Sequence, residues 1–151
     1  MSMFETDLLS DLIQRKRSCL AQLRGMGDKQ FELARTGAIT QLLELLAAKQ
    51  HVLVQLQQVE RQLDRFRGED PERRQWRSPQ KREQCAADQA ECERLLTEIV
   101  IQEKRSEQEL IRRRDEAAAQ LSGAAWAGQA RGAYVAQPLG GAGQLDLVSE
   151  G

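Results

Sequence analysis

The chain has 151 residues, which is room for one domain. Charged residues make up 30% of it and aromatic residues 4%, a composition typical of extended helices rather than of sheets. The 22 basic and 23 acidic residues leave a net charge of −1, so no excess of one sign predicts binding to nucleic acid or to an anionic membrane.

The sequence predicts a cytoplasmic protein with no membrane insertion. No stretch reaches the roughly 18 uninterrupted apolar residues that a membrane span needs. The residues from Met1 to Asp7 lack the basic-then-apolar order of a signal peptide. Cys85 and Cys92 are too far apart on one predicted helix to form a disulfide. We interpret them as small buried hydrophobic residues in a reducing compartment.

The first predicted helix covers about residues 3–24. Gly25-Met26-Gly27 is expected to end it, because glycine readily adopts the left-handed conformation of a helix C-cap. Apolar residues at helical spacing form its expected packing stripe: Phe4, Leu8, Leu12, Cys19, Leu20 and Leu23.

The second predicted helix covers about residues 28–67, with Asp28 as its N-cap. Gly37 lies inside it, where a glycine costs about 1 kcal/mol relative to alanine. We expect a kink or a short break at Gly37, or else a close contact with another helix. The expected packing stripe leaves wider gaps at Lys49 and Glu60 and contains Ile39, Leu42, Leu46, Leu53, Leu56, Leu63 and Phe66.

The third predicted helix covers about residues 78–122. Pro71 in the preceding loop prevents continuation of the second helix, and Ser78-Pro79 has the order of an N-cap followed by the first helical residue. Gly123 is expected to end the helix. Its stripe contains Cys85, Cys92, Leu95, Leu96, Ile99, Leu110, Ala117 and Leu121.

These elements predict an all-α fold, an elongated antiparallel three-helix bundle or coiled-coil hairpin over residues 1–122. Residues 123–151 contain seven of the eleven glycines, so we expect a flexible C-terminal tail. Trp126 and Tyr134 lie in that tail, where apolar side chains suit a segment that folds onto a partner.

No residue pattern predicts an enzyme, a cofactor site or a metal site. His51 is the only histidine, so neither a multi-histidine metal site nor a Ser-His-Asp triad can be assembled. The basic clusters at 73–77 and 112–114 are flanked by acidic residues. We interpret them as solvated faces, with Trp76 closing the end of the hairpin; a nucleic-acid patch at 73–77 is the alternative.

The segment from Lys29 to Gln50, followed by Val52, Leu53 and Leu56, resembles the flagellar export chaperones of the FlgN family. These proteins guard the hook–filament junction proteins before secretion. The family has a glycine after a short helical stretch, a leucine-rich run ending in Lys-Gln, and a small-residue tail with a tyrosine. Gly132-Ala133-Tyr134 is similar to that tail.

The resemblance implies a cytoplasmic chaperone that binds the terminal helices of hook-associated flagellar proteins and delivers them to the flagellar export gate. It implies cargo contacts at Leu110, Ile111, Leu121 and Trp126 and docking to the gate through Tyr134. We expect a monomer or a weak homodimer. The alternative is a structural coiled-coil component, such as an export-stalk subunit or a spacer, which carries no cargo.

Overall fold

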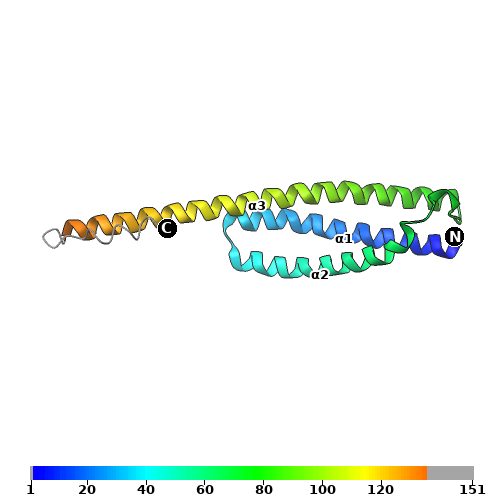
Figure 1. Ribbon diagram of the computed structural model, residues 1–151, viewed down its shortest axis with the longest axis horizontal. Coiled ribbons are helices and arrows are strands. Elements are labelled where there is room, and N and C mark those ends of the chain that lie inside the picture. Colours follow the sequence, from blue (N-terminus) through cyan, green and yellow to red (C-terminus); the bar gives the residue numbers. More distant parts are fainter. Residues whose placement is uncertain (1, 136–151) are drawn as a thin grey trace. The chain divides into compact units, whose positions relative to one another are not determined.

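The computed structural model describes residues 2–135, with only the backbone of Tyr134 and Val135, and confirms an all-α fold (Figure 1). The chain divides into two compact units, residues 1–107 and residues 108–151, whereas the sequence suggested a bundle ending at residue 122. The described residues form three α-helices and two short 3₁₀ helices: α1 (Met3–Thr36), α2 (Ile39–Leu63), η1 (Asp64–Phe66), η2 (Pro71–Arg73) and α3 (Pro79–Val135).

Unit 1 is a three-helix bundle in which α1 lies between α2 and α3 (Figure 1). The helix α2 runs antiparallel to α1, since Lys16 pairs with Glu60 at 2.8 Å and Gln30 accepts from Lys49 at 2.9 Å. The helix α3 returns parallel to α1: Arg17 pairs with Asp88 at 2.7 Å, and Arg24, further along α1, pairs with Glu98 at 2.9 Å. Successive helices are therefore antiparallel, as predicted.

The helices pack through a regular heptad pattern, with inward positions alternately three and four residues apart. On each helix these positions are mostly buried, and a few are half-buried. They are Thr6, Leu9, Ile13, Lys16, Leu20, Leu23, Gly27, Gln30 and Ala34 on α1; Leu42, Leu45, Lys49, Val52, Leu56, Val59 and Leu63 on α2, with Phe66 after it; and Cys85, Asp88, Cys92, Leu95, Ile99, Gln102 and Ser106 on α3.

The predicted turn at Gly25 to Gly27 is wrong, because α1 continues without interruption to Thr36. The turn lies at Gly37, which has a left-handed φ of 74° and donates its N–H to the carbonyl of Ala34. A residue with a side chain adopts this conformation only with strain. The break expected at Gly37 is thus confirmed as the connection between α1 and α2.

Gly27 serves close helix packing instead of a turn. A Cβ atom placed on it would lie 2.7 Å from Cδ of Gln102, inside van der Waals distance. The Gln102 amide lies across the backbone of α1 and donates to the carbonyl of Arg24 at 3.0 Å and to the carboxylate of Asp28 at 2.9 Å. The close contact that we considered for Gly37 therefore occurs at Gly27.

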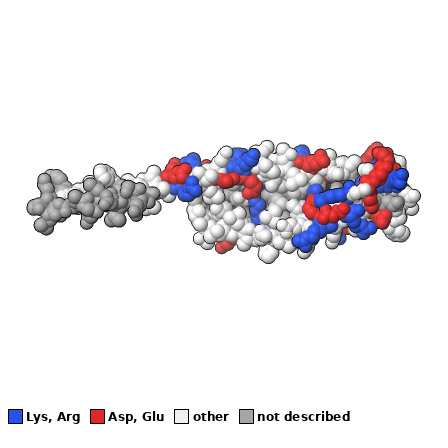
Figure 2. Space-filling model, in the orientation of Figure 1, with Lys and Arg blue, Asp and Glu red and all other residues white. Residues whose placement is uncertain are grey.

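The loop between α2 and α3 closes the end of the bundle beside the start of α1. The Thr6 hydroxyl donates to the carbonyl of Gln75 at 2.6 Å. Trp76 packs against the core formed by Leu9 and its neighbours, as the sequence predicted. Charged side chains gather at this end of unit 1 (Figure 2), where Arg77 pairs with Asp7 at 2.6 Å. The basic cluster at 73–77 is therefore partly neutralised.

The predicted boundaries of α2 and α3 agree with the structure to different degrees. The helix α2 ends at Leu63 and passes into η1, so the end predicted near residue 67 is about one turn late. The start of α3 matches the prediction, since the Ser78 hydroxyl accepts from the backbone N–H of Lys81 at 3.2 Å and Pro79 is the first helical residue. At its other end α3 continues through Gly123 to Val135, so the predicted end at residue 122 is wrong.

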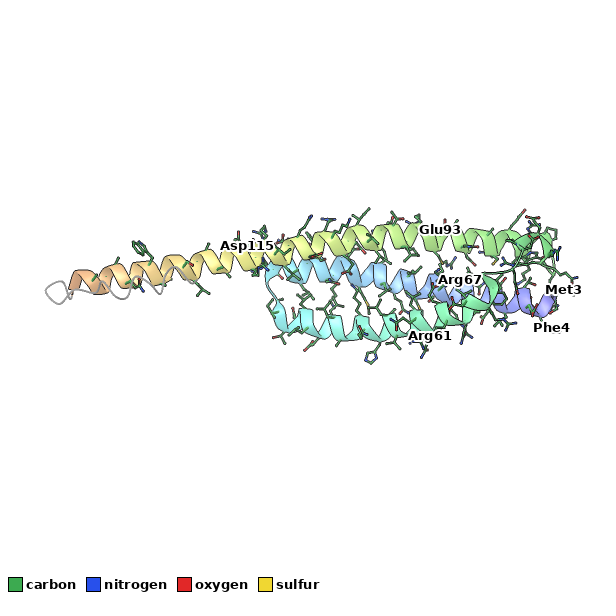
Figure 3. The ribbon with its side chains drawn as sticks, viewed as in Figure 1. Met3, Phe4, Arg61, Arg67, Glu93 and Asp115 are labelled. Carbon is green, nitrogen blue, oxygen red and sulfur yellow. The ribbon has the colours of Figure 1, made fainter. Side chains whose placement is uncertain are left out.

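Several residues predicted to pack are exposed. Phe4, at the start of α1, is 78% exposed (Figure 3), and Ile39 on α2 is 53% exposed. Leu8, Leu46 and Leu96 are exposed as well. The reason is the phase of the heptads: leucines stand next to the inward positions as well as on them, and spacing alone does not distinguish the two sets.

The three cysteines are free and buried, as predicted, and burial raises the pKa of the thiol of each. Within residues 2–135, no helix combines the length and the apolar character needed to span a membrane. The same part of the chain contains no group of three or more His, Cys, Asp or Glu residues placed to hold a metal ion.

Replacement of one inward leucine should separate packing from surface effects. We expect Leu20→Ala, at a position with 0% exposure, to lower the free energy of unfolding by about 2–5 kcal/mol. The matched control Leu43→Ala, at a residue that is 61% exposed, should change it by about 0.5 kcal/mol or less. Urea unfolding followed by circular dichroism measures both. Equal losses would contradict the heptad assignment.

The two glycines of the expected turn should respond differently to alanine. Gly25 has open space around its Cβ position, so Gly25→Ala should raise the free energy of unfolding by roughly 1 kcal/mol through helix propensity. Gly27→Ala should be less stable than Gly25→Ala, because the new methyl group displaces Gln102 from its two acceptors. Thermal unfolding of both variants tests this, and a more stable Gly27→Ala would exclude the close contact.

Candidate helix-binding surfaces

Unit 2 contains the four residues that the sequence assigned to cargo. Ile111, Leu121 and Trp126 are exposed on α3, with Leu121 at 72% and Trp126 at 54%, and Leu110 is half-buried. All four belong to one continuous helix. The tail was expected to be flexible from residue 123, but the described part up to Val135 is helical, which places Trp126 on a helix. Residues 136–151 lie outside the described part of the chain.

The helix does not bring these four side chains onto one side. Leu121 follows Leu110 by eleven residues, which is about three turns, so both lie on the same side of α3. Ile111 is about 100° around the helix from Leu110. Trp126 follows Leu121 by five residues and faces a direction about 140° away. The segment therefore presents Leu110 and Leu121 on one side and Trp126 near the other.

The basic run at 112–114 is paired within unit 2. Arg112 donates to Glu109 at 2.6 Å and to Glu116 at 2.7 Å, and these carboxylates raise the pKa of its guanidinium. Arg114 lies 3.3 Å from Asp115. This run is a solvated, neutralised face, as the sequence predicted, and it leaves the apolar side chains as the distinctive feature of the segment.

Tyr134, which the sequence assigned to gate docking, lies in the last turn of α3. Its side chain is outside the part of the chain that the structure describes. The structure thus places the backbone of Tyr134 on the same helix as Leu121 and Trp126, two turns and more beyond them.

Sequence reasoning missed a second exposed apolar surface, in unit 1. Leu43 and Leu46 on α2 and Leu96 and Val100 on α3 are all exposed, although unit 1 is the folded bundle. None of these four residues had been assigned to a site, and Leu46 and Leu96 had been placed in the packing stripes. Once the phase of the heptads is known, these four residues occupy positions next to the inward positions, which form the seam between the helices. The heptad phase is therefore the sequence signal from which this exposed surface could have been predicted.

The seam of unit 1 contains a buried polar group beside this surface. Lys49 is 8% exposed and donates to Gln30 on α1 and to Glu103 on α3. It therefore ties the three helices together at one level. Burial lowers the pKa of the Lys49 ammonium. A charge in such a position favours one register of the helices over others.

No protein-family model, no curated protein and no solved structure matches this chain.

The buried ammonium predicts a pH dependence of stability. The pKa of Lys49 is lowered from 10.5 in the folded state, so near that pH the unfolded chain holds a proton that the folded chain has lost. Stability contributed by this site therefore rises as pH increases through the interval between the folded pKa and 10.5. Relative to Lys49→Met, the wild-type chain should gain stability from pH 7 toward pH 10.5 in urea unfolding. A constant difference would contradict the burial of the charge.

Proposed function

We propose that this chain is a cytoplasmic export chaperone of the flagellar type III system, similar to the FlgN family. It binds the terminal helices of hook-associated proteins and delivers them to the export gate. The resemblance at residues 29–56 and at Tyr134 supports the proposal from the sequence. The exposed apolar side chains of unit 2 support it from the structure.

The observation that carries the proposal is the exposure of Leu121 and Trp126 on a regular helix. Folding gives no reason for a leucine that is 72% exposed and a tryptophan that is 54% exposed within two turns of each other. Tryptophan is also a residue type enriched at binding hot spots. Amphipathic helices bind through apolar side chains at such positions, laying their own apolar side against them.

The different directions in which α3 presents its apolar side chains suggest how cargo binds. Leu110 and Leu121 offer one terminal helix an apolar stripe, with Ile111 at its edge. Trp126 faces another direction and offers a contact to a second terminal helix of the same cargo. Masking both terminal helices keeps a hook-associated protein from associating before export. Tyr134 lies further along the same helix and provides the contact to the export gate, for which a phenol ring is suited because it buries much area while fixing few torsions.

The test is calorimetric titration of the full chain with a purified hook-associated protein from the organism that encodes it. Leu121→Asp should weaken cargo binding by a hot-spot amount, about 2 kcal/mol or roughly 30-fold. Gln120→Asp adds the same charge on a side that carries neither Leu121 nor Trp126, and should bind like the wild-type chain. Tyr134→Ala should also keep full cargo affinity while losing capture of the export gate.

Two results would count against the proposal. Equal affinities of Leu121→Asp and Gln120→Asp would remove cargo binding from α3. No binding of any hook-associated protein by the wild-type chain would favour the structural alternative, a coiled-coil spacer without cargo.

A further inference from the structure

A second set of apolar residues lies on the side of unit 1 where α2 and α3 face each other. The ion pair between Lys49 and Glu103 identifies the side of α2 and the side of α3 that face each other. Leu46 and Leu53 are three residues before and four after Lys49, and therefore share its side of α2. Val100 is three residues before Glu103, and Leu96 is four before Val100, so both share the side of Glu103 on α3. We call this set, with Leu43, the α2–α3 face.

Packing within unit 1 buries only part of this face. Leu53 is half-buried against the core around Leu20 and Leu95. Leu43 at 61% and Val100 at 53% are open to solvent. On α2 the apolar residues continue from Ile39 to Leu53, a length of about 20 Å at 1.5 Å per residue. Figure 2 shows uncharged side chains over a broad central area of unit 1. This length matches about four turns of a second helix.

The charges bordering the face on α3 are mainly negative. Glu93, Glu103 and Glu107 stand on the same side of α3 as Leu96 and Val100, at spacings of three, four and seven residues (Figure 3 labels Glu93). Among residues 2–135, Glu93 and Glu107 form no salt bridge, and the Glu103 carboxylate remains 44% exposed although it pairs with Lys49. Two cations belong to the described part of the face: Lys49 is buried and already paired, and Lys104, four residues after Val100, is exposed.

We propose that the α2–α3 face binds an amphipathic helix of a partner protein, with a Leu-, Ile- or Val-rich side against Leu46, Leu53, Leu96 and Val100 and Lys or Arg residues opposite Glu93 and Glu107. Charge complementarity selects this occupant. A second copy of the chain would bring the same excess of carboxylates, Glu93 and Glu107 against the single exposed Lys104, to a face that already carries it. The surface lies in unit 1, and the proposal does not depend on the export function.

Two labelled synthetic helices test the charge preference. Both peptides have three heptads with leucine at the a and d positions; one has lysine and the other glutamate at e and g. In fluorescence anisotropy with the full chain, the lysine peptide should bind at least tenfold more tightly than the glutamate peptide at low salt. The double reversal Glu93→Lys with Glu107→Lys should invert this order. Equal binding of the two peptides, or an unchanged order in the reversed variant, would overturn the proposal.

A pair of matched variants tests the location. Val100→Gln removes an apolar side chain from the face and should weaken lysine-peptide binding about fivefold or more. Ile101→Gln is the control, since Ile101 is 56% exposed on the side of α3 that carries Glu98 and Arg105, both of which contact α1. It should bind like the wild-type chain. Equal losses in both variants would place the binding elsewhere.

Sedimentation of the peptide-free chain tests the competing occupant. The proposal expects Val100→Gln and the wild-type chain to sediment alike. A wild-type dimer that Val100→Gln separates into monomers would show that a second copy covers the face, and would overturn the proposal of a basic partner helix.

Discussion

The structure of unit 1 depends on the packing of α1 between α2 and α3. The helix α1 has inward positions at every third and fourth residue from Thr6 to Ala34, and its two flanks meet different partners. On one flank, Arg17 and Arg24 form ion pairs with carboxylates of α3. The other carries Cys19, buried against α2 residues such as Val52. The helices α2 and α3 also contact each other, through Lys49 and Glu103, and loss of the inward residues of α1 would remove the support that both share.

The connection at Gly37 and the contact at Gly27 follow from that role. A helix that packs on two sides must run uninterrupted through the bundle, and α1 does so across two glycines that resemble a turn in sequence. The absence of a side chain at Gly27 lets Gln102 reach the α1 backbone, and the left-handed conformation at Gly37 reverses the chain. The polar group of Lys49, Gln30 and Glu103 then fixes the register, since a slip of any helix would leave a buried ammonium without its acceptors. The inward residues thus form the core of unit 1, and the exposed apolar residues next to them remain available for other contacts.

The sequence predicted the all-α class, the order of three helices and the N-cap at Ser78, because these depend on local chemistry. It misplaced the first turn, since Gly25 and Gly27 have the composition of a C-cap and only tertiary packing shows that one of them receives Gln102. It also misjudged which leucines pack, because Leu42 and Leu46 both fit helical spacing and only the heptad phase separates them. Leu121 and Trp126 were named as candidate residues through the family resemblance, but spacing had also placed Leu121 in the packing stripe of the third helix, and its 72% exposure shows that it does not pack there. The directions of the two side chains, about 140° apart, could be assigned only once α3 was seen to continue beyond Gly123.

We propose that the residues that fold the chain and the residues that bind partners are separate sets. Amide hydrogen exchange of the full chain, free and with a purified hook-associated protein, measures both sets at once. The account predicts strong protection of α1 around Leu20 in either state, weak protection of residues 108–133 in the free chain, and new protection there on binding. Residues 108–133 that exchange as slowly as α1 in the free chain, or that remain unchanged with the partner present, would contradict it.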